Sequence, residues 1–167
     1  MTHITLKVKR KIHTIAGCLA GLVIFSFFLS TLLVETLGTR QDIAQLKNAI
    51  VFPGLFILVP LLAITGGLGR AMMGSTSSAV LVNKMKRMKI IAALGITVLI
   101  PCAIMLSHMA SKDNFGTLFT VIQIIEILAG ATNLTLIILN ARDGVLLTKS
   151  RRQKVAISTK IAREKNM

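Results

Sequence analysis

Long apolar runs separated by short charged stretches dominate the pattern of this chain. Three of the runs contain no charged residue, and a fourth carries a single acid, Glu126, close to its middle. Each run is long enough for the roughly 20 residues with which an α-helix crosses a bilayer. The pattern therefore predicts an all-α membrane protein, a four-transmembrane-helix bundle with spans at about 12–34, 49–69, 90–110 and 115–140.

The first run follows four basic residues, as the apolar core of a signal peptide does. It is longer than the roughly 7–15 apolar residues of such a core, and no small-x-small cleavage signal precedes Glu35. We therefore interpret the run as the first span.

The fourth span carries a stripe of polar residues at helical spacing. The members of this polar intramembrane stripe follow one another at steps of three or seven: Gln123, Glu126, Asn133 and Asn140. A carboxyl group inside a membrane is costly unless it faces the interior of the protein or a water-filled cavity. No basic residue of a predicted span lies at the depth of Glu126, so we expect it to bond to neutral groups such as Ser26 or Ser30.

The charge distribution orients the predicted bundle. The chain carries 20 Lys and Arg against six Asp and Glu, a formal net charge of +14. The basic residues gather at the N-terminus, between residues 70 and 89, and after residue 142. Lys and Arg accumulate on the cytoplasmic side of membrane proteins, so both termini are predicted to be cytoplasmic. This distribution accounts for the net charge without nucleic acid as a partner.

A boundary is predicted at Gly144, where a glycine suits the end of the fourth helix. Residues 1–144 then form the four-helix transmembrane domain. Residues 145–167 form a basic cytoplasmic tail, which we expect to be solvated and partly disordered, with a helix lying on the inner leaflet as the alternative.

Glycines mark candidate positions for close helix packing. Gly17 and Gly21 form a small-xxx-small pair in the first span, the spacing that lets two helices approach closely. The remaining helix-packing candidates are Gly66, Gly67, Gly69 and Gly130. A phosphate-binding loop is excluded for the glycine-rich end of the second span, because no strand precedes it and no Gly-Lys-Ser/Thr follows. In the same span Pro60 predicts a kink near the middle.

His13 is the one histidine at a position with candidate chemistry. It lies at the predicted cytoplasmic rim of the first span. We favour a histidine bonded to a backbone carbonyl or polar neighbour, and keep a role in haem binding or a proton relay as the alternative. His108 belongs to the opposite rim, so the two cannot ligate one haem. We expect no metal site and no cofactor, with haem b as the alternative.

Basic residues next to the membrane are candidates for contact with anionic lipid headgroups, since each such charge near the surface contributes about 1 kcal/mol. A pure topology signal is the equally strong alternative. The candidates are Lys84, Lys86, Arg87, Lys89, Arg151 and Arg152.

The fourth span and its end, from Gln123 through Gly144, resemble the last helix of uncharacterised short four-span inner-membrane proteins of proteobacteria. The likeness extends more loosely to His13, to the glycine-rich end of the second span and to Pro101. It implies a multi-pass protein of the bacterial inner (cytoplasmic) membrane, and no particular activity. Arg10 and His13 also look like the first helix of b-type cytochromes, but the paired intramembrane histidines of those proteins are missing.

Two classes of function remain after these observations. The first is a non-catalytic helical module that packs with itself, as a homo-oligomer, or with a larger membrane complex. The second is a small carrier of protons, ions or electrons that uses Glu126, with b-type haem for electrons. An enzyme is not expected, because the sequence offers no nucleophile and base pair and no ligand cluster.

Overall fold

The computed structural model describes residues 2–72 and 79–165, with side chains outside the description at 2–5, 79–81 and most of 147–165. The described residues form helices joined by short turns. Four helical stretches are long and apolar enough to cross a membrane: Leu6–Leu37, Arg40–Ala71, Val82–Ser111 and Thr117–Leu146. The described residues contain no strand. The predicted all-α architecture with four transmembrane helices is confirmed.

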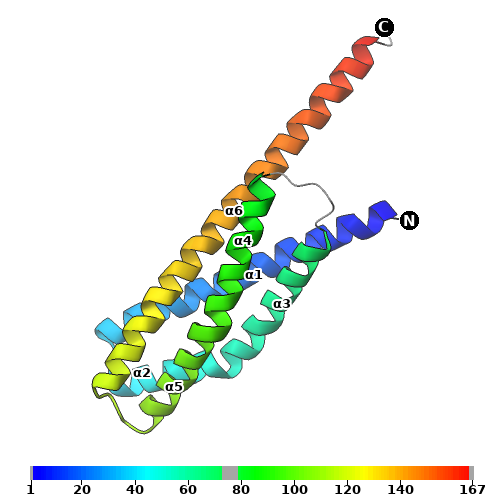
Figure 1. The fold of residues 1–167 in the computed structure, drawn as a ribbon. Coiled ribbons are helices and arrows are strands. Elements are labelled where there is room, and N and C mark those ends of the chain that lie inside the picture. The colour runs from blue at the N-terminus through cyan, green and yellow to red at the C-terminus, as the bar shows by residue number, and fades with distance from the viewer. Residues whose placement is uncertain (1, 73–78, 166–167) are drawn as a thin grey trace.

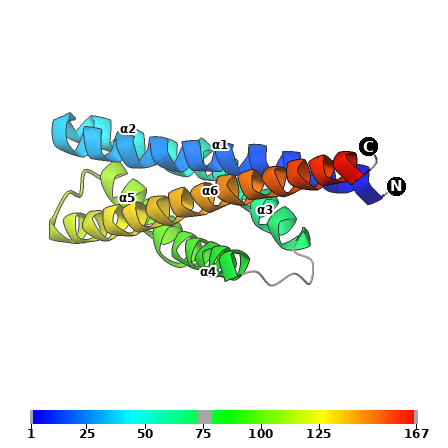
Figure 2. The same cartoon turned by 90° about the horizontal axis from the view of Figure 1, so that it is seen from above.

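The four membrane-length stretches run alternately up and down (Figure 1). Both termini, the end of α3 (Phe56–Ala71) and the start of α4 (Ala79–Leu94) lie at one end, which we call the terminal end. The turns from α1 (Thr2–Leu37) to α2 (Arg40–Ala49) and from α5 (Ile100–Ser111) to α6 (Thr117–Lys165) lie at the opposite end, the hairpin end. The view from above shows the same arrangement (Figure 2). The two termini therefore lie on the same side of any membrane that the bundle spans.

The second span begins earlier than the sequence predicted. Thr39 caps α2: its hydroxyl accepts a hydrogen bond from the backbone N–H of Asp42, whose carboxylate accepts one from the backbone N–H of Thr39. From Arg40 the span runs through α2 and η1 (Ile50–Leu55), which contains a kink, into α3. The stretch predicted as a short external connection is thus the first part of the span.

The interruption in this span lies at Phe52 and not at Pro60. Phe52 has extended backbone angles, φ −138° and ψ 120°, and the next residue is Pro53. A proline disfavours the helical conformation of the residue before it, which explains the position of the break. Pro60 lies inside α3.

The third span has a π-helical turn, η2 (Gly95–Leu99), between α4 and α5. Pro101 lies in the first turn of α5, where a missing backbone N–H costs least. The wider turn thus comes directly before the helix that the proline begins.

The fourth span does not end at Gly144, so the predicted helix end and the partly disordered tail are wrong. α6 runs from Thr117 to Lys165 and extends beyond the rest of the bundle (Figure 1). A glycine ends a helix when it adopts a positive φ, and no described glycine does so. Inside a helix a glycine costs only about 1 kcal/mol relative to alanine, and the helix continues through it.

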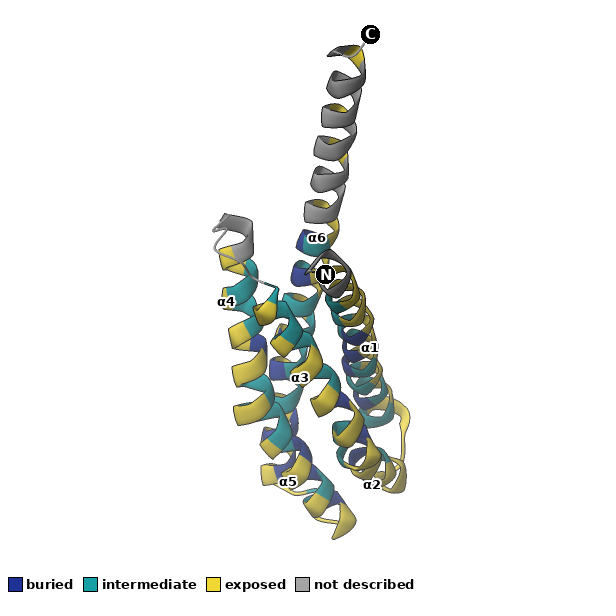
Figure 3. Cartoon of the chain, turned by 90° about the vertical axis from the view of Figure 1, so that its right-hand side faces the viewer, coloured by how far each residue is buried: buried dark blue, intermediate teal, exposed yellow. Residues whose placement is uncertain are grey.

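Burial follows the inward faces of the helices (Figure 3). α1 packs against α3 and α6, α4 packs against α6, and α5 packs against α2 and α6. One apolar cluster is centred on Leu106 and Ile122, and another on Ala20 and Leu58. Large apolar side chains also cover the outward faces, as lipid contact requires.

Four of the six predicted packing glycines contact a neighbouring helix. A methyl group at Gly17 would meet Thr65, at Gly21 Ile137, and at Gly130 the ring of Phe28, each at 3.3–3.6 Å. At Gly69 it would meet His13 at 3.1 Å. At Gly66 and Gly67 it would meet nothing within 4 Å. Among the described residues of one copy, these last two glycines are therefore not points of close helix packing.

Candidate functional site

The first polar group of the bundle interior surrounds Lys47 on α2. This side chain is almost completely buried, with 1% of its surface exposed. Its Nζ donates to Oε2 of Glu126 on α6 at 2.6 Å and lies 3.9 Å from Oε1 of Glu35 on α1. A third interaction comes from Gln123, whose Nε2 donates to the same Oε2 of Glu126 at 3.4 Å. We call Lys47, Glu126, Glu35 and Gln123 the hairpin-end cluster.

The hairpin-end cluster joins one cation to two carboxylates, which gives it a formal charge of −1. Oε1 of Glu35 and Oε1 of Gln123 are buried and accept no hydrogen bond from any described residue. A buried charge is tolerated when an opposite charge and hydrogen bonds compensate for the lost hydration. Lys47 supplies that compensation for Glu126 and, at longer range, for Glu35.

Lys47 overturns the expectation that Glu126 has no basic partner and bonds to Ser26 or Ser30. It was assigned to an external loop because a charged residue interrupts the apolar run there. The signal that places it on a helix is local: Thr39-Arg-Gln-Asp42 is a capping-box pattern, so the helix begins at Arg40. The cluster also lies nearer to one end of the bundle than expected. Glu126 is nine residues from the start of α6, about 14 Å along its axis.

The second polar group lies toward the terminal end, where α4 meets α6. Nη1 of Arg87 donates to Oδ2 of Asp143 at 2.8 Å and to Oδ1 of Asn140 at 3.4 Å. Asn140 and Asp143 are both buried, whereas 23% of the Arg87 side chain is exposed. Lys84, one turn before Arg87, is half-buried, and its Nζ lies 3.4 Å from where a methyl group at Gly144 would be. We call Arg87, Asp143, Asn140 and Lys84 the terminal-end cluster.

The residues predicted to contact lipid headgroups lie in different surroundings. Arg87 bonds inside the bundle to Asp143, a residue that the sequence analysis did not single out. Lys86 and Lys89 are exposed, whereas Lys84 is half-buried. The side chains of Arg151 and Arg152 are outside the described residues.

The polar stripe of α6 thus divides into two clusters. Glu126 and Asp143 are 17 residues apart, about 25 Å along the helix axis. Between them Asn133 is 1% exposed, and its Oδ1 accepts no hydrogen bond from a described residue. All the predicted stripe residues face the interior, but they serve different helices: Gln123 and Glu126 face Lys47 of α2, and Asn140 faces Arg87 of α4.

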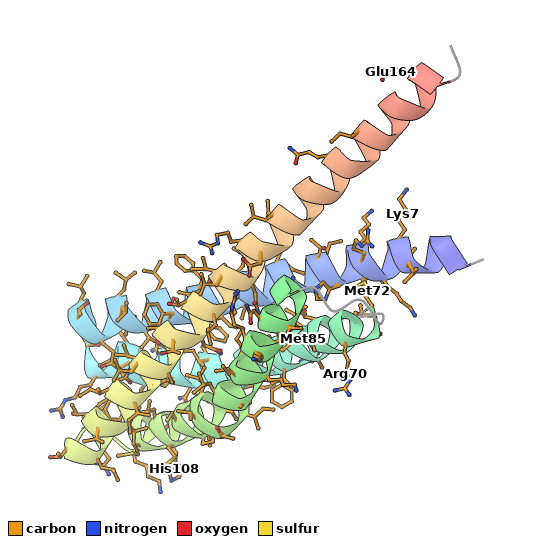
Figure 4. All side chains as sticks on the ribbon, turned by 45° about the horizontal axis from the view of Figure 1, so that its top comes forward. Lys7, Arg70, Met72, Met85, His108 and Glu164 are labelled. Atoms are coloured by element: carbon orange, nitrogen blue, oxygen red, sulfur yellow. The ribbon has the colours of Figure 1, made fainter. Side chains whose placement is uncertain are left out.

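His13 lies between α1 and α3, within electrostatic range of Lys84 in the terminal-end cluster. Its Nδ1 donates to the backbone carbonyl of Thr65 at 2.8 Å. Because Nδ1 carries the proton in this bond, the lone pair of the neutral ring is on Nε2. Figure 4 places His108 at the end of the bundle opposite Lys7 and Arg70, far from the first turns of α1. Over the described residues no group of three His, Cys, Asp or Glu side chains is arranged to hold a metal ion.

Comparisons with protein-family models, with curated proteins and with solved structures found no match to the chain. The class of protein therefore follows from the fold: four long apolar helices define a small multi-pass integral membrane protein.

Proposed function

We propose that this protein is a non-catalytic helical module of the bacterial inner membrane, which associates with copies of itself or with a larger membrane complex. Both termini and the basic helix beyond Asp143 are cytoplasmic in this proposal. The positive-inside rule supports the orientation, because the terminal end carries the basic clusters. The likeness of the fourth span to proteobacterial four-span proteins supports the choice of membrane.

The observation that carries the proposal is the way the interior charges are used. Lys47 joins α2 to α6 and Arg87 joins α4 to α6, so each buried ion pair links helices far apart in the sequence. Such pairs fix which helices pack together and in which register, a use of buried charge known from other helical assemblies. A bundle held in one arrangement presents a constant lipid-facing surface to a partner.

A carrier of protons or ions is the second candidate, and one observation favours it. Buried oxygen atoms of Glu35, Gln123 and Asn133 accept no hydrogen bond from described residues, and the first two belong to a cluster with a net negative charge. Ionisable residues inside membranes often mark the path of an ion or a proton.

One pair of measurements separates the two candidates. The triple variant Lys47→Met, Glu35→Gln, Glu126→Gln removes all three charges of the hairpin-end cluster and keeps side chains of similar size. The module proposal expects it to fold and to migrate in native gels, from membranes solubilised in mild detergent, with the same assembly size as the wild type. It also expects neither protein to carry protons into liposomes that contain a pH-sensitive dye.

Two results contradict the module. A wild-type proton flux that the triple variant lacks establishes the carrier. Migration of the wild type as a single copy in every mild detergent, with no cross-link to any protein in intact membranes, removes the association. A visible absorption spectrum tests haem separately, since a Soret band in the purified protein establishes that haem is bound.

A further inference from the structure

Lys84 occupies an unusual position for a charged side chain. It is half-buried between α4 and α6, yet it donates no hydrogen bond to any described residue. Its Nζ comes close to α6 at Gly144, where the absence of a side chain leaves it room. The nearest acid, Asp143, is already bonded to Arg87. A partly desolvated ammonium group with three donors gains from an acceptor that approaches from outside the bundle.

Two guanidinium groups border the same place. Arg87 uses Nη1 for Asp143 and Asn140, which leaves the donors on Nη2 and Nε. Arg142 is exposed, and its Nε lies 3.9 Å from Oδ1 of Asp143. Lys84, Arg87 and Arg142 against the one carboxylate of Asp143 give a formal charge of +2 where α4 meets α6. The place therefore attracts an anion and offers donors from two helices.

We propose that Lys84, Arg87 and Arg142 form a binding site for the phosphate group of an anionic phospholipid. The phosphate accepts from Lys84 and from the free donors of the two arginines, a geometry for which guanidinium groups are well suited. Asp143 holds Arg87 in place. The site lies where α6 leaves the bundle (Figure 1), at the level where membrane-length helices reach the headgroups. A lipid is thus the source of phosphate nearest to it.

This site differs from a general attraction between basic residues and the membrane. Lys86 and Lys89 belong to the same helix but are exposed, and they gain only the diffuse attraction of the surface. Lys84 faces α6, so its loss removes a specific contact. The inference does not rest on the proposed association, because a lipid can bind whether or not the protein has a protein partner.

The test uses the full-length protein in detergent micelles with added phosphatidylglycerol or phosphatidylcholine, and counts bound lipids by native mass spectrometry. We expect tighter binding of phosphatidylglycerol. Lys84→Gln is expected to weaken it at least about fivefold, because it removes a charge-assisted hydrogen bond to the phosphate and not only a diffuse attraction. The matched control Lys86→Gln removes the same charge from the same helix and is expected to change binding less than twofold. Lys84→Arg is expected to restore it.

A second variant tests the space beside Lys84. Gly144→Leu keeps every charge and fills the position that Nζ of Lys84 approaches, so it is expected to weaken binding of phosphatidylglycerol as Lys84→Gln does. Thermal unfolding of each variant shows that it is folded.

Three results overturn the site. Equal weakening by Lys84→Gln and Lys86→Gln indicates diffuse attraction. Equal binding of phosphatidylglycerol and phosphatidylcholine excludes recognition of the net charge. Displacement of the bound lipid by millimolar inorganic phosphate, or binding of phosphate alone, assigns the site to a soluble anion instead.

Discussion

The two charge clusters on α6 differ in how their charges are compensated inside the bundle. At the hairpin end Lys47, 1% exposed, lies between two carboxylates, and the cluster has a formal charge of −1. At the terminal end Arg87 bonds to the carboxylate of Asp143 and Lys84 lies nearby without a bond to it, the cluster has a formal charge of +1, and 23% of the Arg87 side chain is exposed. The hairpin-end cluster is closed to water and contains buried oxygen atoms of Glu35 and Gln123 that accept no hydrogen bond from a described residue. The terminal-end cluster lies near the membrane surface and has N–H donors without a bonded acceptor among the described residues.

The difference shows what each cluster can do. The charges of a closed cluster lose all their hydration, and each needs its partner to compensate for that loss. Such a cluster therefore acts mainly on the stability of the bundle. A cluster with spare donors at the surface loses less when one partner is removed, because water and headgroups replace it. We therefore expect mutations at the two ends to differ in size and in their response to salt.

The largest effect is expected for Lys47→Met. This change leaves the carboxylates of Glu126 and Glu35 buried without a cation, and breaking a buried pair in this way costs about 3–5 kcal/mol. Unfolding in mixed micelles with increasing dodecyl sulfate measures the loss. The neutral triple variant of the same cluster is the control and is expected to recover most of it. A loss below about 1 kcal/mol for Lys47→Met means that water reaches the hairpin-end cluster.

Arg87→Met is expected to have the next largest effect, about 1–3 kcal/mol, because Asn140 and Asp143 lose their donor while the site stays near water. Arg87→Lys is the matched variant. A lysine keeps the charge but lacks the planar fork that serves Asn140 and Asp143 together, so part of the loss is expected to remain. The same unfolding assay ranks these variants. A larger loss for Arg87→Met than for Lys47→Met reverses the comparison.

The four spans follow from the sequence because hydrophobic length is a local property. The polar stripe of α6 does too, since helical spacing alone places Gln123 and Asn133 on one face. The residues that bond to this stripe cannot be predicted from the sequence, because a charged residue within an apolar run looks like the end of a span. Lys47 and Arg87 fall outside the predicted spans for that reason, although the helix that carries each of them begins well before it, at Arg40 and at Ala79.

Gly144 shows a second limit of prediction from the sequence, which concerns contacts between helices. A glycine after an apolar run favours a helix end, and only the tertiary structure shows that the space beside it admits the ammonium group of Lys84. The sequence did not reveal this pairing, because the two residues are on different helices. Gly66 and Gly67 show the same limit: small residues permit a close approach, but the described residues of one copy place no neighbour within 4 Å of them.

Salt is expected to change the stability lost on mutation at one cluster and not at the other, and this difference is smaller than the losses themselves. The Debye length falls from about 10 Å at 0.1 M to about 3 Å at 1 M, and exposed charges are screened far more than buried ones. The stability lost on Arg87→Met should therefore shrink as salt is raised in the unfolding assay. The loss on Lys47→Met should stay constant. An equal response of both variants would show that the two clusters are equally accessible to ions.

The smallest effect is expected at Gly144. An added methyl group would lie 3.4 Å from Nζ of Lys84, the end of a flexible side chain that can move aside. Gly144→Ala should therefore gain part of the roughly 1 kcal/mol by which alanine favours a helix over glycine.

Gly54, in the second span with Lys47, is the control. A methyl group there would lie 2.6 Å from the ring of Phe27 and 2.9 Å from the carbonyl of Ala49, so Gly54→Ala should cost about 1–3 kcal/mol. Thermal unfolding of both variants, measured side by side, is expected to give opposite signs. A loss at Gly144 as large as that at Gly54 would mean that Lys84 is held too firmly to move aside, and that the terminal-end cluster is packed as rigidly as the other half of the bundle.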